Sequence, residues 1–290
     1  MNEAATFEDR FWESSDGLKL HCRDYPGDDR LTPIVCVPGL TRNARDFANL
    51  PALLNQRNES RRMIMADLRG RGESEYAKDS ATYHPGTYVA DIIKMMDKLD
   101  LPDAIFFGTS LGGIVTMLIA ARHPECIKGA LLNDIGPDVD QEGLDRIGSY
   151  VGQGRSFDTW AHAARDMAAT SGDIFPDYEL NDWIAFVKRV YRMNSSGRIK
   201  LDYDMKISEP FESKGGGSAP LWKALDAMKE IPTLILRGEL SDLFSDITAR
   251  KMIDRLEKAE LVTVPRVGHA PTLEEPAALD AIVGLLQRTD

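Results

Sequence analysis

The chain has little cysteine, and its cysteines show no pairing pattern. Cys22, Cys36 and Cys126 are odd in number and widely spaced. This argues against a disulfide framework and against the paired spacings of a zinc site, so no metal is expected. A reduced cytoplasm is the simplest setting for such a chain. Cys36 falls in an apolar segment, where cysteine behaves as a small apolar residue.

Long apolar runs and an excess of positive charge are also missing. No segment is apolar for long enough to cross a bilayer. Residues 1–9 have neither a basic start nor an apolar run, so no signal peptide is expected. Lys and Arg number 35 against 46 Asp and Glu, for a formal net charge of −11. That balance disfavours nucleic acid and anionic membranes as partners, and we expect a cytoplasmic protein that binds neither.

Strands and helices are expected to alternate along most of the chain. With 290 residues, 43% of them hydrophobic, the sequence is long enough to bury a large core. A hairpin is expected first, and the further strands predict a mainly parallel sheet covered by helices on both faces. The expected elements are strands over 7–14, 18–25, 34–37, 62–67, 104–107, 129–134, 233–236 and 261–264, with helices over 44–54 and 88–99.

The most informative segment is residues 104–113, in which an apolar strand runs into Gly-Thr-Ser-Leu-Gly and then a strongly apolar helix. Gly108 and Gly112 lack a Cβ where strand end and helix start approach each other. The tight turn exposes the hydroxyl of Ser110, which we expect to be a nucleophile. Ser110 as an ordinary helix N-cap is the alternative interpretation.

A serine nucleophile needs a base and an acid that orients the base. His269 follows the expected strand 261–264, and Asp242 follows the strand 233–236, so these two are the candidates for base and acid. Glu239 and Asp246 lie close to Asp242 in the sequence. Asp134, at the end of the strand 129–134, is an alternative candidate for the acid. His21, His84, His123 and His162 are expected to be structural or solvated.

If Ser110 attacks a carbonyl group, the site also needs hydrogen-bond donors for the oxyanion that forms. The backbone N–H of Leu111, the residue after the nucleophile, is one expected donor. The second should come from the turn after the strand 34–37. Pro38 has no N–H to give, so the backbone N–H of Leu40 is predicted, with Gly39 letting the backbone approach a substrate.

These motifs together resemble the α/β-hydrolase superfamily, in its esterase, lactonase and carbon–carbon hydrolase branch. The resemblance rests on residues 37–40, 67–74, 108–113, 133–137, 237–242 and 268–269, which include the order serine, acid, histidine. It implies Ser110 as nucleophile, His269 as base and Asp242 as its acid. It also implies Leu40 and Leu111 as oxyanion donors, and a structural role for Arg69 and Arg71, held in local ion pairs.

Between the strands ending at 134 and beginning at 233 the alternation stops. Helical, polar and aromatic segments take over, with helices expected over 157–167 and 179–193, and a flexible-looking stretch at 214–218 closes the insertion. Residues 1–136 and 220–290 are expected to form the core domain, with 137–219 as a helical lid over the catalytic face. Trp160, Trp183, Phe186 and Trp222 are candidate pocket walls.

The expected function is hydrolysis of a small-molecule carboxylic ester or lactone through an acyl-enzyme, without a metal or organic cofactor. The protein is expected as a monomer or homodimer. Hydrolysis of carbon–carbon bonds in ring-cleavage products is an alternative. Thr109 and the aromatic residues of the expected lid do not distinguish it from hydrolysis of an ester or lactone. A non-catalytic small-molecule receptor on a hydrolase scaffold is another, because a fold alone does not determine function.

Overall fold

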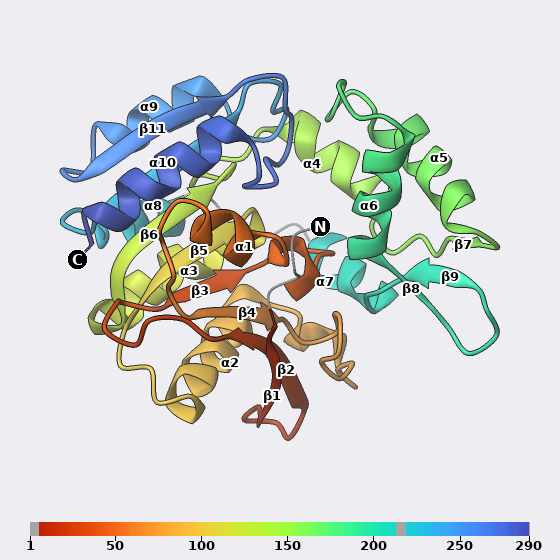
Figure 1. Cartoon of the computed structure of the whole chain (residues 1–290), viewed down its shortest axis with the longest axis horizontal. Coiled ribbons are helices and arrows are strands. Elements are labelled where there is room, and N and C mark those ends of the chain that lie inside the picture. The colour runs from red at the N-terminus through yellow and green to blue at the C-terminus, as the bar shows by residue number, and fades with distance from the viewer. Residues whose placement is uncertain (1–5, 213–218, 290) are drawn as a thin grey trace.

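The computed structural model describes residues 6–212 and 219–289 (Figure 1). The stretch 214–218, expected from the sequence to be flexible, and residues 1–5 lie outside the described residues. Within the described ranges, no helix combines the length and the apolar character that a bilayer span requires.

Eight strands form the main sheet, in the order β1-β2-β4-β3-β5-β6-β10-β11. The hairpin β1–β2 is antiparallel and β2 pairs antiparallel with β4, whereas every pair from β4 to β11 is parallel. The predicted mainly parallel α/β sheet is thus confirmed. The strands are β1 (Glu8–Glu13), β2 (Lys19–Tyr25), β3 (Ile34–Val37), β4 (Met63–Asp67), β5 (Ala104–Thr109), β6 (Ile127–Asn133), β10 (Thr233–Gly238) and β11 (Ala259–Val264).

The central strands are apolar throughout because both of their faces are covered. In β3, Val35 and Val37 belong to one buried cluster, whereas Ile34 and Cys36 belong to the other. Successive side chains of a strand point to opposite faces, so this division follows directly from the pleat. Cys36 is fully buried, as its apolar surroundings predicted.

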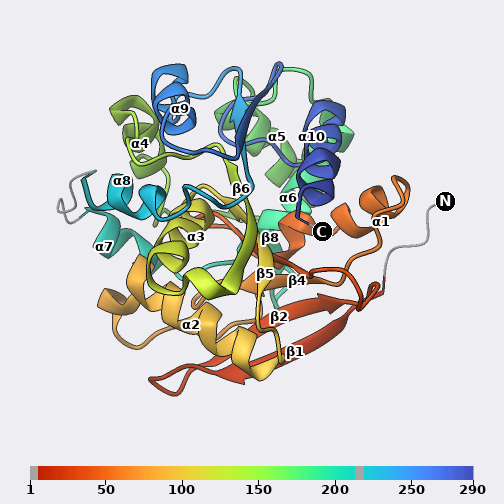
Figure 2. The ribbon, with the colours of Figure 1, turned by 90° about the vertical axis from the view of Figure 1, so that its left-hand side faces the viewer.

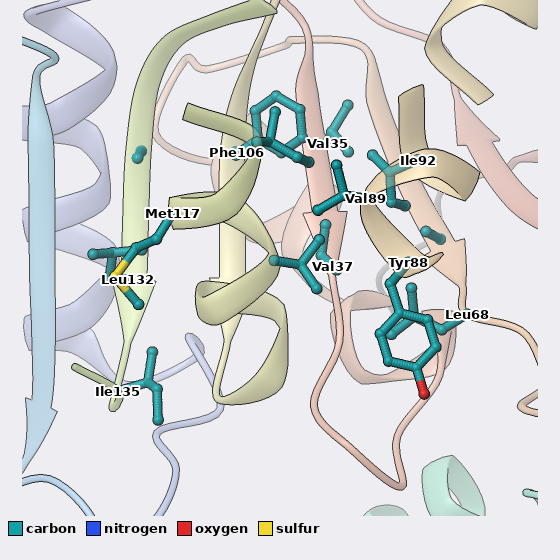
Figure 3. Packing of buried hydrophobic residues seen from close by; sticks show 14 of the residues in the cluster. Val35, Val37, Leu68, Tyr88, Val89, Ile92, Phe106, Met117, Leu132 and Ile135 are labelled. Carbon is teal, nitrogen blue, oxygen red and sulfur yellow. The ribbon is translucent and has the colours of Figure 1, made fainter. Parts of the chain in front are cut away.

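Helices form a layer on each face of the sheet (Figure 2). Helices α2, α3, α8 and α9 share the cluster that contains Val35, and α10 belongs to the cluster that contains Ile34. In Figure 3 Val89 and Ile92 of α2 approach Val35 and Val37, and Met117 of α3 lies beside Leu132 of β6. The helices of the two layers are α1 (Leu50–Asn55), α2 (Pro85–Lys98), α3 (Leu111–Arg122), α8 (Ala219–Asp226), α9 (Asp246–Ile253) and α10 (Pro276–Gln287).

Residues 137–212, between β6 and α8, gather on one side of the molecule, at the right of Figure 1. They contain helices and a separate three-stranded sheet in the order β7-β9-β8. We call residues 137–212 the inserted segment. Its elements are α4 (Gln141–Gly148), β7 (Ser156–Phe157), α5 (Trp160–Ser171), α6 (Leu180–Val190), β8 (Tyr191–Met193), β9 (Ile199–Leu201) and α7 (Ser208–Glu212).

Polar contacts tie the end of the inserted segment to the core. Asp202, which is fully buried, accepts a hydrogen bond from Arg45 at 2.6 Å and forms an ion pair with Arg192. The backbone carbonyl of Asp202 accepts from the N–H of Gly72, and Tyr83 donates to Asp204 at 2.6 Å. The chain after β9 is therefore held directly against the loop that follows β4.

Candidate active site

Ser110 occupies a strained turn between β5 and α3. Its backbone has φ 52° and ψ −116°, a left-handed φ that non-glycine residues rarely adopt. A Cβ added to Gly108 would lie 2.5 Å from the carbonyl oxygen of Gly112, so a larger residue could not occupy this turn. The Ser110 side chain makes no cap hydrogen bond to α3. The ordinary N-cap interpretation is therefore wrong.

The Ser110 hydroxyl lies 2.9 Å from Nε2 of His269. His269 stands in the loop after β11, and its side chain is 9% exposed. The loop is fixed on both sides of the histidine, because Gly268 donates its N–H to Ile174 at 2.7 Å and Asn133 donates its side-chain amide to the Pro271 carbonyl at 2.8 Å. The two residues predicted as nucleophile and base are thus within hydrogen-bonding reach.

The other imidazole nitrogen, Nδ1 of His269, lies 2.8 Å from Oδ2 of Asp134. Asp134 is fully buried directly after β6. Its Oδ2 also accepts from the Ser241 hydroxyl at 2.6 Å, and its Oδ1 accepts from the N–H of Gly238 at 2.8 Å. Every contact of this carboxylate is with a donor, so Nδ1 of His269 carries the proton and Nε2 is the acceptor facing Ser110.

The prediction that Asp242 orients His269 is wrong, because Asp134 holds that position. Both oxygens of Asp242 are instead bound by the Arg146 guanidinium of α4, with Nη2 to Oδ1 at 2.8 Å. Burial opposes ionisation of Asp242, but the hydrogen bonds and charge of Arg146 outweigh it and hold the pKa of this carboxyl below its usual value. Glu239 and Asp246 do not replace it: Glu239 accepts from the Arg266 N–H and Asp246 pairs with Arg250.

The sequence carried a signal for Asp134, since this residue directly follows an apolar strand. β6 and β10 are parallel neighbours, so the loops at their carboxyl ends lie next to each other, and each offers a carboxylate. The strand order and the ion pair between Arg146 and Asp242, which are 96 residues apart, determine which of the two carboxylates binds His269. Neither feature can be predicted from the local sequence.

The predicted oxyanion donor Leu111 directly follows Ser110, and the other, Leu40, lines the same cavity as Ser110. Leu111 is the first residue of α3, and Gly112 packs so closely on the end of β3 that a Cβ there would overlap the Val37 carbonyl oxygen. The loop carrying Leu40 begins at that point. Among the residues that the structure describes, neither the Leu40 N–H nor the Leu111 N–H donates to a loop, cap or side-chain acceptor. The assignment of both as oxyanion donors stays a prediction.

A cavity of about 270 Å³ lies between the core and the inserted segment. Ser110, His269, Gly39 and Leu40 contribute its core side, and residues of α4, α5 and α6 contribute the other. The lining includes apolar side chains such as Val151, Met167 and Phe175, together with Arg42, Arg146, Tyr150, Arg155 and Arg189. These polar side chains were not found by sequence reasoning, because they become neighbours only through the fold.

Of the four aromatic residues predicted as pocket walls, Phe186 lines the cavity. Trp183 is 3% exposed and packs in an aromatic cluster with Phe175 and Phe186, so it holds the inserted segment together. Trp222 lies in α8 and donates to Asp138 at 2.9 Å. Trp160 and Trp222 are not part of the described cavity lining.

The two arginines of the loop after β4 behave differently from each other. Arg69 forms the predicted ion pairs, with Asp91 at 2.7 Å and Asp16 at 2.8 Å. Arg71 forms hydrogen bonds to neutral groups instead, the carbonyl oxygens of Leu40 and Arg69 at 2.8 and 2.6 Å and the Tyr88 hydroxyl at 3.0 Å. Arg71 thereby fixes the loop that carries Leu40.

The α/β-hydrolase class is defined by a parallel sheet with a serine on a strand–helix turn. An aspartate and a histidine follow the serine in the chain, and their side chains form a hydrogen-bonded chain with it. The chain belongs to the alpha/beta hydrolase family, whose family model matches residues 34–282.

Relatives with assigned activities span most of the chain. A 3-hydroxybutyrate-oligomer hydrolase of Cupriavidus necator is 33% identical over 264 residues, covering 88% of this chain and 87% of that protein. A 2-hydroxymuconate semialdehyde hydrolase of a Pseudomonas species is 25% identical, covering 87% of this chain and 85% of that protein. The crystal structure of an alpha/beta hydrolase from Novosphingobium aromaticivorans is 49% identical with a TM-score of 0.92, covering 98% of this chain and 99% of that one.

Proposed function

We propose that the protein is a serine hydrolase that cleaves a small-molecule carboxylic ester or lactone through an acyl-enzyme intermediate. The single observation that carries this proposal is the hydrogen-bonded chain from Ser110 through His269 to Asp134, which opens into a cavity. The relationship to an oligomer hydrolase in Cupriavidus necator supports an ester as substrate.

In the proposed reaction Ser110 attacks the carbonyl carbon while His269 accepts the hydroxyl proton at Nε2. Asp134 keeps the histidine in the required tautomer and stabilises the imidazolium that forms. The N–H groups of Leu40 and Leu111 bind the oxyanion of the tetrahedral intermediate. His269 then gives its proton to the leaving alcohol, and a water that it deprotonates releases the acid and regenerates the serine.

The inserted segment acts as a lid in this proposal. Its side chains close the cavity opposite Ser110, which excludes water and shapes the space for the substrate. We accordingly propose that residues 1–136 and 220–290 form the catalytic core and 137–219 the lid. The substrate is the partner that the site is built for, and a monomer or homodimer supplies a complete site, because all of its residues come from one chain.

Replacing Ser110 by alanine tests the proposed nucleophile. Turnover of p-nitrophenyl butyrate should fall about 10⁴-fold or more, since a triad without its nucleophile retains only the catalysis of binding and the oxyanion donors. Ser196→Ala, in the exposed loop between β8 and β9, is the matched control and should keep wild-type turnover. Equal turnover in the Ser110→Ala variant and the wild type would overturn the proposal.

A fluorophosphonate probe separates an enzyme from a receptor on the same scaffold. An activated Ser110 should be labelled in minutes, and mass spectrometry should place the adduct on the peptide containing residue 110. A folded wild-type protein that resists the probe would favour the receptor.

Hydrolysis of carbon–carbon bonds is the second candidate, favoured by the relationship to the Pseudomonas hydrolase. A panel of esters, lactones and dienoic acids distinguishes it by the products released.

A further inference from the structure

Two arginines from different parts of the chain line the cavity that contains Ser110. Arg42 follows Leu40 by two residues, and Arg146 lies in α4 of the inserted segment. The stem of Arg42 reaches close to the nucleophile: its Cγ and the Cβ of Ser110 lie 3.5 and 3.6 Å from the place that a Cβ on Gly39 would occupy. A group bound by this guanidinium is therefore within a small molecule's length of the serine.

Each guanidinium is held along one edge by a carboxylate. Arg42 uses Nε and Nη2 to bind Asp46, both at 2.6 Å, and Arg146 uses the same two nitrogens to bind Asp242. Arg42 also stacks on the ring of Phe186, with 4.4 Å between the guanidinium carbon and the ring centroid. A guanidinium has five N–H donors in a rigid plane. The ion pairs therefore orient the two side chains and use only the Nε and Nη2 edge of each, so the Nη1 groups lie outside them; Arg146 also interacts with the Tyr150 phenol.

A phenol adds a third donor to this group. Tyr150, which also lines the cavity, keeps 39% of its surface accessible. Burial raises the pKa of the Tyr150 phenol, and the nearby positive charges of Arg146 and Arg42 oppose that rise. Arg42, Arg146 and Tyr150 thus act on the same small region of the cavity, and we call these three residues the cationic wall.

Each of the four arginines in the described lining is paired with a carboxylate: Arg42 with Asp46, Arg146 with Asp242, Arg155 with Asp166 and Arg189 with Glu274. The counter-ions of Arg146 and Arg189 are not part of the described lining, so these two guanidinium groups line the cavity while their carboxylates do not. Guanidinium donors in a partly dehydrated cavity bind an anion more strongly than exposed ones do.

We propose that the cationic wall binds a carboxylate group of the substrate, so that the compound cleaved at Ser110 is an ester that carries a free carboxylate. This inference rests on the proposed function. Each guanidinium keeps N–H donors outside its ion pair, and the two oxygens of one carboxylate can accept from two such donors at once. Apolar lining residues such as Val151 and Met167 accommodate the carbon chain between carboxylate and ester.

Matched pairs of esters test the preference for charge. Monoethyl adipate carries its carboxylate on the acyl side of the ester, and the linear dimer of 3-hydroxybutyrate carries it on the alcohol side. Diethyl adipate and the methyl ester of the dimer are their uncharged counterparts. For at least one pair, kcat/KM should be about 10- to 100-fold higher for the charged ester, as hydrogen bonds to a charged group contribute. Equal values, or a preference for the neutral ester in both pairs, would overturn the inference.

Glutamine variants assign that preference to the cationic wall. In Arg42→Gln and in Arg146→Gln, the ratio of kcat/KM for charged over neutral ester should fall about tenfold or more. The control is Arg250→Gln, which removes an arginine that binds the aspartate four residues before it on the exposed helix α9, and it should keep the wild-type ratio. Because Arg42 and Arg146 lie on different elements, misfolding of one variant leaves the other informative. A wild-type ratio in both variants would contradict the assignment.

A binding experiment separates this inference from the proposed function. Adipate should bind Ser110→Ala in isothermal titration calorimetry, and the affinity should fall about tenfold or more when Arg146→Gln is added. If the wild type hydrolyses none of the four esters, the proposed function fails while adipate binding still supports a carboxylate site. If esters are hydrolysed but millimolar adipate does not bind, the carboxylate site fails and the hydrolase stands.

Discussion

Replacing Asp134 by asparagine reverses one hydrogen bond at the candidate active site. Oδ1 of Asp134 accepts from the Gly238 N–H, a backbone donor that cannot rotate. The asparagine must therefore keep its carbonyl oxygen at that position. Its NH₂ group then takes the place of Oδ2 and faces Nδ1 of His269. Nδ1 becomes the acceptor, the ring proton moves to Nε2, and the histidine no longer accepts a proton from Ser110.

Two effects are expected to lower the turnover of Asp134→Asn. The wrong tautomer removes the base, and the imidazolium that forms in the transition state loses the negative charge now 2.8 Å away. Comparable substitutions in serine proteases reduce kcat about 10⁴-fold, which corresponds to about 5.5 kcal/mol in the activation barrier. We expect kcat for p-nitrophenyl butyrate to fall by about 10³- to 10⁴-fold, because the oxyanion donors remain.

Asp242→Asn is the matched control, since it changes the carboxylate that sequence reasoning favoured. The hydrogen-bonded chain from Ser110 to Asp134 stays intact in this variant, so turnover of the neutral ester should fall less than about tenfold. Circular dichroism and thermal unfolding verify that both variants fold. If Asp242→Asn were crippled while Asp134→Asn kept most of its activity, the assignment of the acid from this geometry would be refuted.

Two further predictions concern the fold around the site. Gly112→Ala places a Cβ against the Val37 carbonyl. Overpacking of this kind should lower the free energy of unfolding by about 3 kcal/mol in urea titrations. The control is Gly154→Ala, whose Cβ has nothing within 4 Å, and it should unfold like the wild type. Burial opposes protonation of His21, but Asp67 and Asp9 outweigh it and raise its pKa. The protonated imidazole therefore stabilises the folded state fully below the unfolded pKa near 6.5, and this contribution is lost as the pH rises through the higher folded value. The melting temperature should fall as the pH rises above about 6.5, with a smaller slope in His21→Gln; an equal slope in both proteins would show that His21 is not responsible.

The central strands were predictable because they are buried on both faces. β3 and β5 are continuous apolar segments, which is the pattern of parallel strands between two helical layers. The single helix predicted over 44–54 was wrong: a 3₁₀ helix covers Ala44–Phe47, and α1 starts at Leu50. Pro51 explains the break, because proline is accepted in the first turn of a helix and not in its interior.

The sequence could not predict the parts that depend on contacts between distant segments. Strands β7, β8 and β9 are two or three residues long, too short for a periodic signal, and the predicted helix over 179–193 ends in β8. Ser110 and His269 could be predicted from the sequence because Ser110 directly follows β5 and His269 lies in the loop after β11. The choice between Asp134 and Asp242, and the cationic wall, depend on the position of α4 relative to the core.

The contacts of Asp202 limit how the inserted segment can be exchanged. Arg45 belongs to the core, but its carboxylate partner Asp202 lies in the inserted segment, directly after β9. A chimera that replaced the whole insertion would leave that arginine without its counter-ion, and an orphaned charge in such a position costs several kcal/mol. A chimera with a different inserted segment should therefore return to the sequence of this protein before Asp202, or carry a substitution of Arg45 as well.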